Sequence, residues 1–561
     1  MDPPNILGNL SNSSIYPPHS EVPGKGPLLP LPLNLIGLII SYLEAPADLA
    51  RTCRTCRVFH YMTLPQLYTD VTLRSYDSIR YSPEHGRVEG SGMGSPFVMG
   101  LNGLVLRNVS GYVRQLRFVG EWREHDLEEF SKRGRVPDSS IMLTTLVRVV
   151  IERSANLRDL CWELNTKMLP TVWQGLESSN IRSLTVRFPS SRDPRPIMIV
   201  PPIPSLVALR VLDVDPLCYV DDISLLLAGS RNLRELTVVW SPRMREVREP
   251  SVNLSTMFGR CQAANQPLNL TKLTVKNLFT YSSDTCGKFY DCSAVQEITV
   301  INSSGGLGDA GAAAFVDSSY RRKSETFPSL KSLRGDKVSR ELQLLLANTS
   351  GLEKLYLIGD TKATKYDTPN NTFPRSPSSN GSSPPSDLHS DTLRDDTIEA
   401  IAQNHGQTLR HLLLPPQWRL TSDNIALLVR NCPRLEQLGL GADFERFMSM
   451  RLLMPFLPNM FAIRVLDNPD STEFRDKMHE LDDGTHEKQI GGATSAREWS
   501  RIRWMQLADL VFEAGRPELM ADDDEEEDGA PGKMSYRRKV WKRDGEAVKD
   551  IAIWKMDSMD V

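Results

Sequence analysis

The stretch DNIALLVRNCPRLEQLGL, residues 423–440, joins a helix-like segment to a strand-like segment. Asp423–Cys432 has the apolar spacing of an amphipathic helix, and Leu435–Leu440 continues as Leu-x-x-Leu-x-Leu with alternating apolar residues. A unit of helix, turn and short strand cannot bury its apolar faces alone. The stretch therefore predicts neighbours of the same kind that stack on both of its sides.

The same phrase recurs through the middle of the chain. If the second apolar position of each copy is taken as its register, the copies lie at Leu116, Leu160, Leu184, Leu212, Leu236, Leu273, Ile298, Leu333, Leu355, Leu412, Leu438 and Leu466. Most intervals after Leu160 fall within the roughly 20–29 residues expected of leucine-rich repeats, and the longer intervals indicate insertions. Helix-like stretches precede several copies, at 222–231, 340–347 and 396–405.

These observations predict an α/β fold in which a leucine-rich-repeat-like solenoid has parallel strands on its concave face and helices outside. One isolated copy would fit an ordinary amphipathic helix, but twelve copies with similar flanks favour the repeat. A doubly wound enzyme also alternates strands and helices. The glycine cluster GGLGDAG, residues 305–311, is separated from the strand-like segment at Val300 by polar residues, and a flexible turn explains it.

A different pattern precedes the repeats, in LPLNLIGLIISYLEAPADLARTCRTCRVF, residues 31–59. Pro32 suits the first turn of a helix because it lacks the N–H that would be unsatisfied there. One helical stripe then contains Leu35, Ile36, Ile39, Ile40 and Leu43, and a second stripe contains Leu49, Cys53, Cys56 and Phe59. So much apolar surface on so short a segment needs a partner.

These residues resemble the F-box family. The residues that match its pattern in order are Leu31, Pro32, Leu35, Ile39, Tyr42, Leu43, Asp48, Leu49, Cys56 and Phe59. The segment departs from the pattern at Asn34, at Thr55 and by one extra residue before Asp48. The resemblance implies a three-helix module that binds a Skp-type adaptor and so joins a cullin-RING ubiquitin ligase. The phrase NCPRLEQLGL, in turn, resembles F-box proteins that carry leucine-rich repeats.

The same resemblance gives the candidate adaptor-binding residues, some of which must form the core of the module: Leu31, Pro32, Leu35, Ile36, Ile39, Leu43 and Leu49. The function it implies is that of a non-enzymatic substrate-recognition subunit, in which the repeats bind an unknown target protein for ubiquitination. The alternative is a leucine-rich-repeat scaffold without a ligase role, whose helical module only caps the solenoid. A hydrolase or a nucleotide-dependent enzyme ranks third, because neither GxSxG nor HExxH occurs and we expect no catalytic residue and no cofactor.

Composition restricts the partners. The chain has 66 basic and 70 acidic residues and a formal net charge of −4, so we expect no nucleic-acid partner. No apolar run is long enough to cross a membrane, and no basic stretch precedes the first apolar run, which predicts a cytoplasmic or nuclear protein.

Eight cysteines in so long a chain indicate reduced thiols. Cys53 and Cys56 form a CxxC, but Cys286 and Cys292 are not a matching second pair, so we expect no metal site. Both cysteines of the CxxC are expected on the inward stripe of the second helix.

The predicted boundaries follow from these patterns. We expect a disordered N-terminus at 1–27, the F-box-like module at 28–75, a flexible insertion at 76–100, the repeat array at 101–470 with a disordered insertion at 361–391, a C-terminal cap at 471–515 and a charged tail at 516–561. The insertion holds three candidate phosphorylation sites that precede proline, Thr368, Ser376 and Ser383.

The last part of the chain is predicted to contain a cap for the repeat array and, after it, a charged tail. Ser495–Glu513 suits a capping helix over the last repeat. The acidic run Asp522–Asp528 and the basic residues Arg537, Arg538, Lys539, Lys542 and Arg543 indicate a solvated tail or a segment for nuclear import or partner binding. Trp541 and Trp554 in this stretch can still dock onto the body.

Overall fold

A computed structural model describes residues 31–76, 96–122, 127–189, 200–215, 220–242, 257–280, 289–305, 327–358 without 337 and 339, 386–442 without 419, 456–467, 473–521 with short gaps, and 534–561. It is a mixed α/β structure with open, mostly parallel sheet, as the sequence predicted at this level. The chain divides into two compact units, residues 1–206 and 207–561. Among the described residues, no helix is long and apolar enough to cross a membrane.

Unit 1 begins with three short helices, α1 (Leu33–Ser41), α2 (Pro46–Thr52) and α3 (Arg57–Leu67). Pro32 caps α1, and Pro46 occupies the first turn of α2, where a missing N–H has no consequence. The helices enclose a small core of Ile36, Ile40 and Leu49, against which Leu43, Phe59, Met62 and Leu67 pack. The second stripe of the sequence pattern thus belongs to two helices that are separated by a turn.

That turn corrects the placement of the two cysteines. Cys56 is exposed and stands immediately before α3, where its sulfur accepts a hydrogen bond from the Phe59 N–H at 3.5 Å. Cys53 is half-buried just after α2. Neither cysteine is part of an inward stripe, because the helix that would have carried both ends at Thr52.

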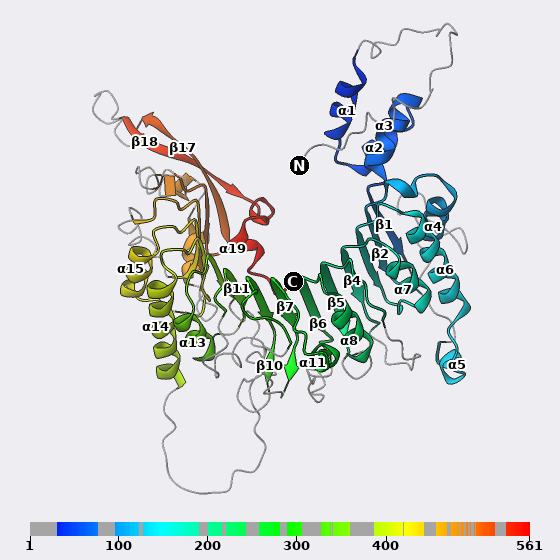
Figure 1. The fold of residues 1–561 in the computed structure, drawn as a ribbon. Coiled ribbons are helices and arrows are strands. Elements are labelled where there is room, and N and C mark those ends of the chain that lie inside the picture. The colour runs from blue at the N-terminus through cyan, green and yellow to red at the C-terminus, as the bar shows by residue number, and fades with distance from the viewer. Residues whose placement is uncertain are drawn as a thin grey trace, which may run out of the picture. The chain divides into compact units, whose positions relative to one another are not determined.

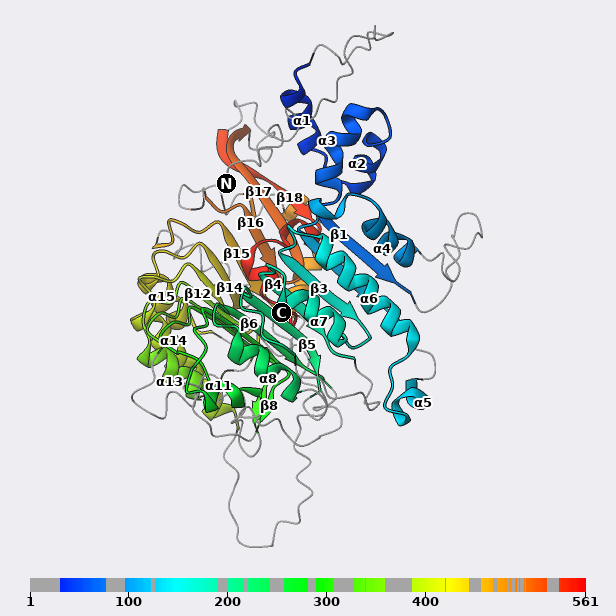
Figure 2. The same cartoon turned by 45° about the vertical axis from the view of Figure 1, so that its right-hand side comes forward.

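The rest of unit 1 is a parallel sheet covered by helices on one face (Figure 2). Its strands, in order, are β1 (Asp70–Ser75), β2 (Gln115–Gly120), β3 (Asp159–Leu164) and β4 (Ser183–Arg187). Its other elements are α4 (Pro96–Leu106), η2 (Ser110–Tyr112), α5 (Leu127–Lys132), α6 (Asp138–Arg153) and α7 (Pro170–Glu177). β1 lies inside the range that we assigned to the helical module, and α4 starts inside the predicted insertion at 76–100, of which 77–95 lie outside the described residues.

Unit 2 contains a longer sheet whose first ten strands are parallel. In spatial order they are β5 (Ala208–Val214), β6 (Glu235–Trp240), β7 (Lys272–Lys276), β9 (Glu297–Ile301), β11 (Ser332–Gly335), β12 (Lys354–Leu357), β13 (His411–Leu413), β14 (Gln437–Gly441), β15 (Ala462–Leu466) and β16 (Trp504–Leu507). The antiparallel strands β17 (Leu510–Ala521) and β18 (Met534–Arg543) follow β16 at the edge of the sheet. Separately, β8 (Phe279–Thr280) pairs with β10 (Ser304–Gly305).

The helices of unit 2 lie mainly on one face of this sheet, and the chain's final helix lies on the opposite face, which we call the inner face (Figure 1). The outer helices are α8 (Val220–Gly229), α11 (Gly259–Ala263), α13 (Arg340–Asn348), α14 (Ser386–Asn404) and α15 (Ser422–Asn431). The remaining helical elements are α17 (Glu473–Glu480), η7 (Gly545–Val548) and α19 (Ala552–Lys555). The structure confirms helices at the four predicted places, 222–231, 340–347, 396–405 and 423–432.

All twelve predicted strand positions lie in strands, but two registers are wrong. Leu209 and not Leu212 is the partner of Leu236, and Ile463 and not Leu466 is the partner of Leu438. Both segments offer two apolar residues, three positions apart, so the pattern alone was ambiguous. In β5 the register also shifts between Val211 and Val214, where Asp213 has a positive φ of 57°.

The C-terminal predictions need larger corrections. Ser495–Glu513 contains β16 and the start of β17 in place of a capping helix, because Trp504–Leu507 alternates between half-buried and buried residues with the period of a strand. The charged tail forms β18, η7 and α19, and α14 begins at Ser386, before the predicted end of the 361–391 insertion.

Arg538, one of the basic residues assigned to that tail, is buried, and its guanidinium donates hydrogen bonds to the carbonyls of Gly515, Trp499, Ile502 and Ala514. Residues 1–27, the acidic run 522–528 and the three proline-directed sites lie outside the described residues.

Adjacent repeats are tied together at the turn after α14. His405 is fully buried, with its Nε2 3.0 Å from the Leu346 carbonyl oxygen and its Nδ1 3.3 Å from the Leu352 N–H. At the next residue, Gly406, a Cβ would meet the backbone carbonyl oxygens of Asn431 and of Ala402, the latter at 2.6 Å. The turn therefore has no room for a side chain.

We predict that Gly406→Ala lowers the free energy of unfolding by about 1–3 kcal/mol, because backbone atoms of two repeats must move apart. The control is Gly259→Ala in the same unit, where a Cβ meets nothing within 4 Å. We expect that change to stay within about 0.5 kcal/mol. Urea denaturation of both variants measures the difference, and equal midpoints would contradict the close approach.

Candidate functional site

The outer side of α1 is a row of exposed apolar side chains. Leu35, Leu38, Ile39 and Tyr42 are 42%, 53%, 57% and 77% exposed. They are spaced at i, i+3, i+4 and i+7, so they form one helical face. Large apolar side chains gathered in this way mark an interaction surface more often than chance exposure does. We call these four residues the α1 face.

The structure divides the seven candidate adaptor-binding residues into two groups. Leu31, Pro32, Leu35 and Ile39 are exposed, whereas Ile36 and Leu49 are buried in the module core and Leu43 packs against it half-buried. Leu38 and Tyr42 complete the exposed face, and sequence reasoning did not include them in the candidate set. Their spacing from Leu35 was the available signal, but the sequence could not tell which side of α1 the other two helices cover.

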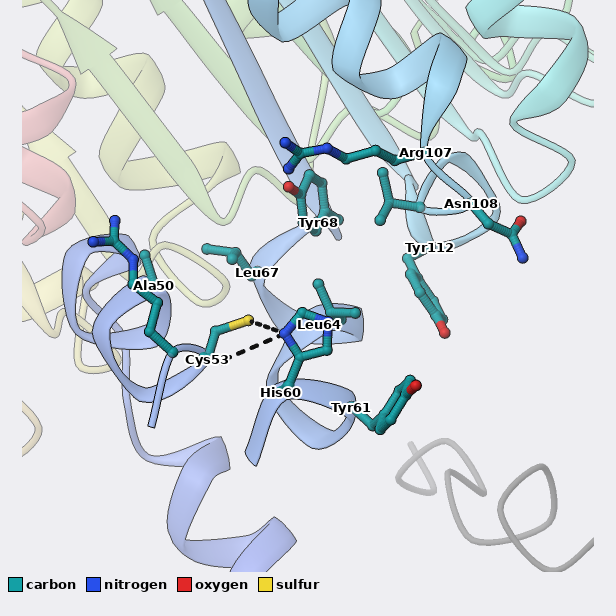
Figure 3. A pocket seen from close by; sticks show the side chains of 12 residues that line it. Ala50, Cys53, His60, Tyr61, Leu64, Leu67, Tyr68, Arg107, Asn108 and Tyr112 are labelled. Atoms are coloured by element: carbon teal, nitrogen blue, oxygen red, sulfur yellow. Dashed lines mark hydrogen bonds between the residues drawn. The ribbon is translucent and has the colours of Figure 1, made fainter. Parts of the chain in front are cut away.

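A cavity of about 600 Å³ lies at the other side of the module, among α2, α3 and the segment after α4 (Figure 3). Inside it, the Cys53 sulfur lies 3.1 Å from His60 Nδ1, which is also 3.3 Å from the Cys53 carbonyl oxygen. A thiol beside an imidazole suggests nucleophilic chemistry, which also needs a third group to orient the ring. No carboxylate is among the described residues that line this cavity, so the contact is better explained as a link between α2 and α3.

The inner face of unit 2 carries a row of residues in register across ten strands. The row is Arg210, Thr237, Thr274, Thr299, Arg334, Tyr356, Leu413, Gly439, Arg464 and Gln506. We call it the inner row. The neighbouring residue on the N-terminal side of each row member is apolar and almost completely buried, as Leu333 and Ile463 are. Alternation along each strand therefore places the row on the face opposite to those residues.

Two arginines of the inner row are buried and charged. Arg334 and Arg464 are only 6% and 8% exposed, and burial lowers the pKa of both guanidinium groups. Asp557 approaches Arg464 at 2.8 Å. Burial raises the pKa of this carboxyl group, and the nearby Arg464 opposes that effect. The pKa of each group, Arg464 and Asp557, thus depends on the charge of the other.

The side chains of the inner row are suited to binding. Within the described ranges, no three His, Cys, Asp or Glu side chains are grouped so that they could hold a metal ion. The inner row offers guanidinium, amide and aromatic groups, which recognise peptide carbonyls, carboxylates and apolar side chains. Neither protein-family models nor curated proteins match this chain.

The inner face also contains a pH-sensitive contact. His411 in β13 has its Nδ1 2.7 Å from the Tyr356 hydroxyl, and burial followed by the charges of Lys354 and Arg410 lowers the pKa of His411 to about 4. Because the unfolded chain binds the proton at about pH 6.5, the stability that the neutral ring contributes is lost as the pH falls from about 6.5 towards 4.

We predict that this one group removes roughly 2 kcal/mol of unfolding free energy between pH 7.5 and pH 5.0. His411→Gln should lose that much less than the wild type over the same interval, whatever its stability at pH 7.5. Urea denaturation at the two pH values measures both losses. An identical loss in the two proteins would show that His411 is not the titrating group.

Proposed function

We propose that this chain is the substrate-recognition subunit of an SCF-type cullin-RING ubiquitin ligase. In this proposal α1–α3 form an F-box-like module that binds a Skp-type adaptor, and the repeats form a leucine-rich-repeat-like solenoid that binds the target protein. The chain performs no chemistry itself, since ubiquitin transfer belongs to partner subunits. The observation that carries the proposal is the α1 face, which is apolar, exposed and helical.

The division of α1 into two sides supports docking over the capping alternative. Ile36 and Ile40 already fill the core of the module, so the exposed face is not needed for its folding. A cap would bury its apolar residues against the first repeat, whereas Ile39 and Tyr42 are more than half exposed. Amphipathic helices that enter a partner's groove use the same i, i+3, i+4, i+7 spacing.

Two of the three departures from the F-box pattern, Asn34 and Thr55, lie outside the module core. Asn34 is an exposed residue of the first turn of α1. Thr55 is exposed in the turn between α2 and α3, where its hydroxyl donates a hydrogen bond to the Thr52 carbonyl at 2.8 Å. Polar residues at both positions are therefore compatible with a folded module.

The parallel repeats support the second half of the proposal. Each strand from β5 to β16 turns one set of residues towards the core and the alternate set towards the inner face. The set on the inner face can vary without loss of the core, which suits a surface that selects a target.

We predict that Leu35→Asp combined with Ile39→Asp weakens binding of a purified Skp-type adaptor at least 30-fold, as expected if the two residues together contribute about 2 kcal/mol or more. Ile141→Asp is the matched control, because Ile141 is an exposed apolar residue of α6, 46% exposed, in the same unit. Titration calorimetry measures the affinity, and circular dichroism checks that both variants remain folded.

A folded wild-type chain that binds no Skp-type adaptor would remove the ligase function and leave the scaffold. Equal affinities of the double variant and the Ile141→Asp control would move the adaptor site away from the α1 face.

A further inference from the structure

The last part of the chain folds back onto the inner face of its own unit. α19 lies against β13 and β14, and Ile553 is fully buried among Tyr356, Leu413, Ala462 and Leu466 (Figure 1). The Ile553 N–H donates a hydrogen bond to the Gln437 side-chain oxygen at 3.0 Å. The segment 551–561, which we call the C-terminal segment, thus occupies a surface that a partner would otherwise meet.

Arg464 of the inner row holds the first half of this segment. Its Nη1 donates to the Ile553 carbonyl oxygen at 2.8 Å and to Asp557 Oδ2 at 2.8 Å. Its guanidinium carbon lies 5.5 Å from the centre of the Trp554 ring. Gln506, the next member of the row, accepts hydrogen bonds from Arg464 Nε at 2.8 Å and from Trp554 Nε1 at 2.5 Å. Arg464 therefore contacts a main-chain carbonyl, an aromatic ring and a carboxylate of the C-terminal segment.

Arg334 holds the second half through the main chain. It donates hydrogen bonds to the carbonyl oxygens of Met556 at 3.0 Å, Ser558 at 2.5 Å and Asp560 at 2.8 Å. Beyond it, Lys276 lies 3.6 Å from the Asp560 carboxylate, and Arg210 donates to the Val561 carbonyl oxygen. Basic side chains on β5, β7, β11 and β15 thus follow an acidic segment along the sheet.

Most of these contacts do not depend on this particular segment. Any extended peptide presents the main-chain carbonyls that Arg334 binds. Only three side chains of the segment make the contacts that we treat as specific. They are the apolar Ile553, the aromatic Trp554 beside it, and the acidic Asp557 three residues after Trp554. The connection to β18 is exposed at Asp544 and Gly545, so the segment can leave the face without dismantling the sheet.

We propose that the inner row is a binding track for acidic peptides of the form apolar-aromatic-x-x-acid, and that the C-terminal segment fills this track in cis until a target displaces it. This inference rests on the proposed function only for the identity of the competitor as a ligase target. The track and its occupant stand on the contacts of Arg334 and Arg464. A tethered ligand competes at an effective concentration in the millimolar range, so a target needs several such contacts to displace it.

The test uses the full chain with a specific protease site inserted between Asp544 and Gly545. The probe is a fluorescein-labelled peptide with the sequence of the C-terminal segment, IAIWKMDSMDV, added in excess and followed by fluorescence anisotropy. We expect the probe to bind the cleaved protein at least tenfold more tightly than the uncleaved protein, because cleavage removes the tether.

Two acids within the probe provide a matched pair. The side chain of Asp557 is 18% exposed and that of Asp560 is 95% exposed. We expect the Asp557→Asn probe to bind at least tenfold more weakly than the parent probe, whereas the affinity of the Asp560→Asn probe should stay within about threefold of the parent's.

The protein offers a second matched pair. We expect Arg464→Gln to weaken binding of the parent probe at least tenfold. The control Arg410→Gln changes an exposed arginine that pairs with Glu436, and it should leave binding unchanged.

Several results would overturn the inference. The first is equal affinity of the parent probe before and after cleavage, and the second is equal affinity of the two substituted probes. The third is a cleaved protein that does not bind the probe although mass spectrometry shows that the segment has dissociated. An uncleaved protein that is dimeric in solution and becomes monomeric on cleavage would assign the track to a second copy. Adaptor binding by the same samples separates the two proposals, since it tests the α1 face and not the inner row.

Discussion

The structure depends on one constraint, the in-register pairing of buried apolar residues across parallel strands. Leu236, Leu273, Ile298, Leu333 and Leu355 are successive Cα partners, and each is at most 2% exposed. Because successive side chains of a strand point to opposite faces, fixing these residues in the core fixes their neighbours on the inner face. A slip of one residue would reverse both sets. The inner row is therefore a geometric consequence of the core.

The same pairing explains why irregular spacing is tolerated. Leu355 and Leu412 are far apart in sequence, yet they are direct partners in β12 and β13. The entropy of closing a loop grows only slowly with its length, so a long insertion changes the stability of the pair little. Repeat length can then vary while the register of the strands stays constant.

Local patterns predicted most of unit 2 because they encode local structure. Alternation fixed the strands, and helical spacing fixed α13 and α15. Two registers were wrong because β5 and β15 each offer two apolar residues at the decisive place. Docking of Trp554 onto the body was predicted, and Trp554 packs against the cluster around Ile553. The polar contacts of the C-terminal segment could not be predicted, for another reason. Arg334 and Ser558 are 224 residues apart, and no local periodicity reports a contact of that range.

The α1 face could be predicted from the sequence only in part. The helical stripe of α1 could be read from the sequence, but its division into a buried and an exposed side depends on where α2 and α3 pack. Ile36 and Ile39 have equal hydrophobic character, and only the neighbouring helices decide that one belongs to the core and the other to the surface.

The Arg464–Asp557 pair shows why the C-terminal segment is better understood as a ligand than as a structural strap. Removing two charges from water costs much of the energy that their attraction returns, so a buried ion pair adds less stability than apolar residues of the same volume would. A permanent strap would gain from apolar contacts of the kind that Ile553 makes. Charged groups instead discriminate between partners, because an occupant without the acid leaves the buried Arg464 without a carboxylate partner. That penalty falls on wrong ligands, which is the property that a selective and exchangeable binding track requires.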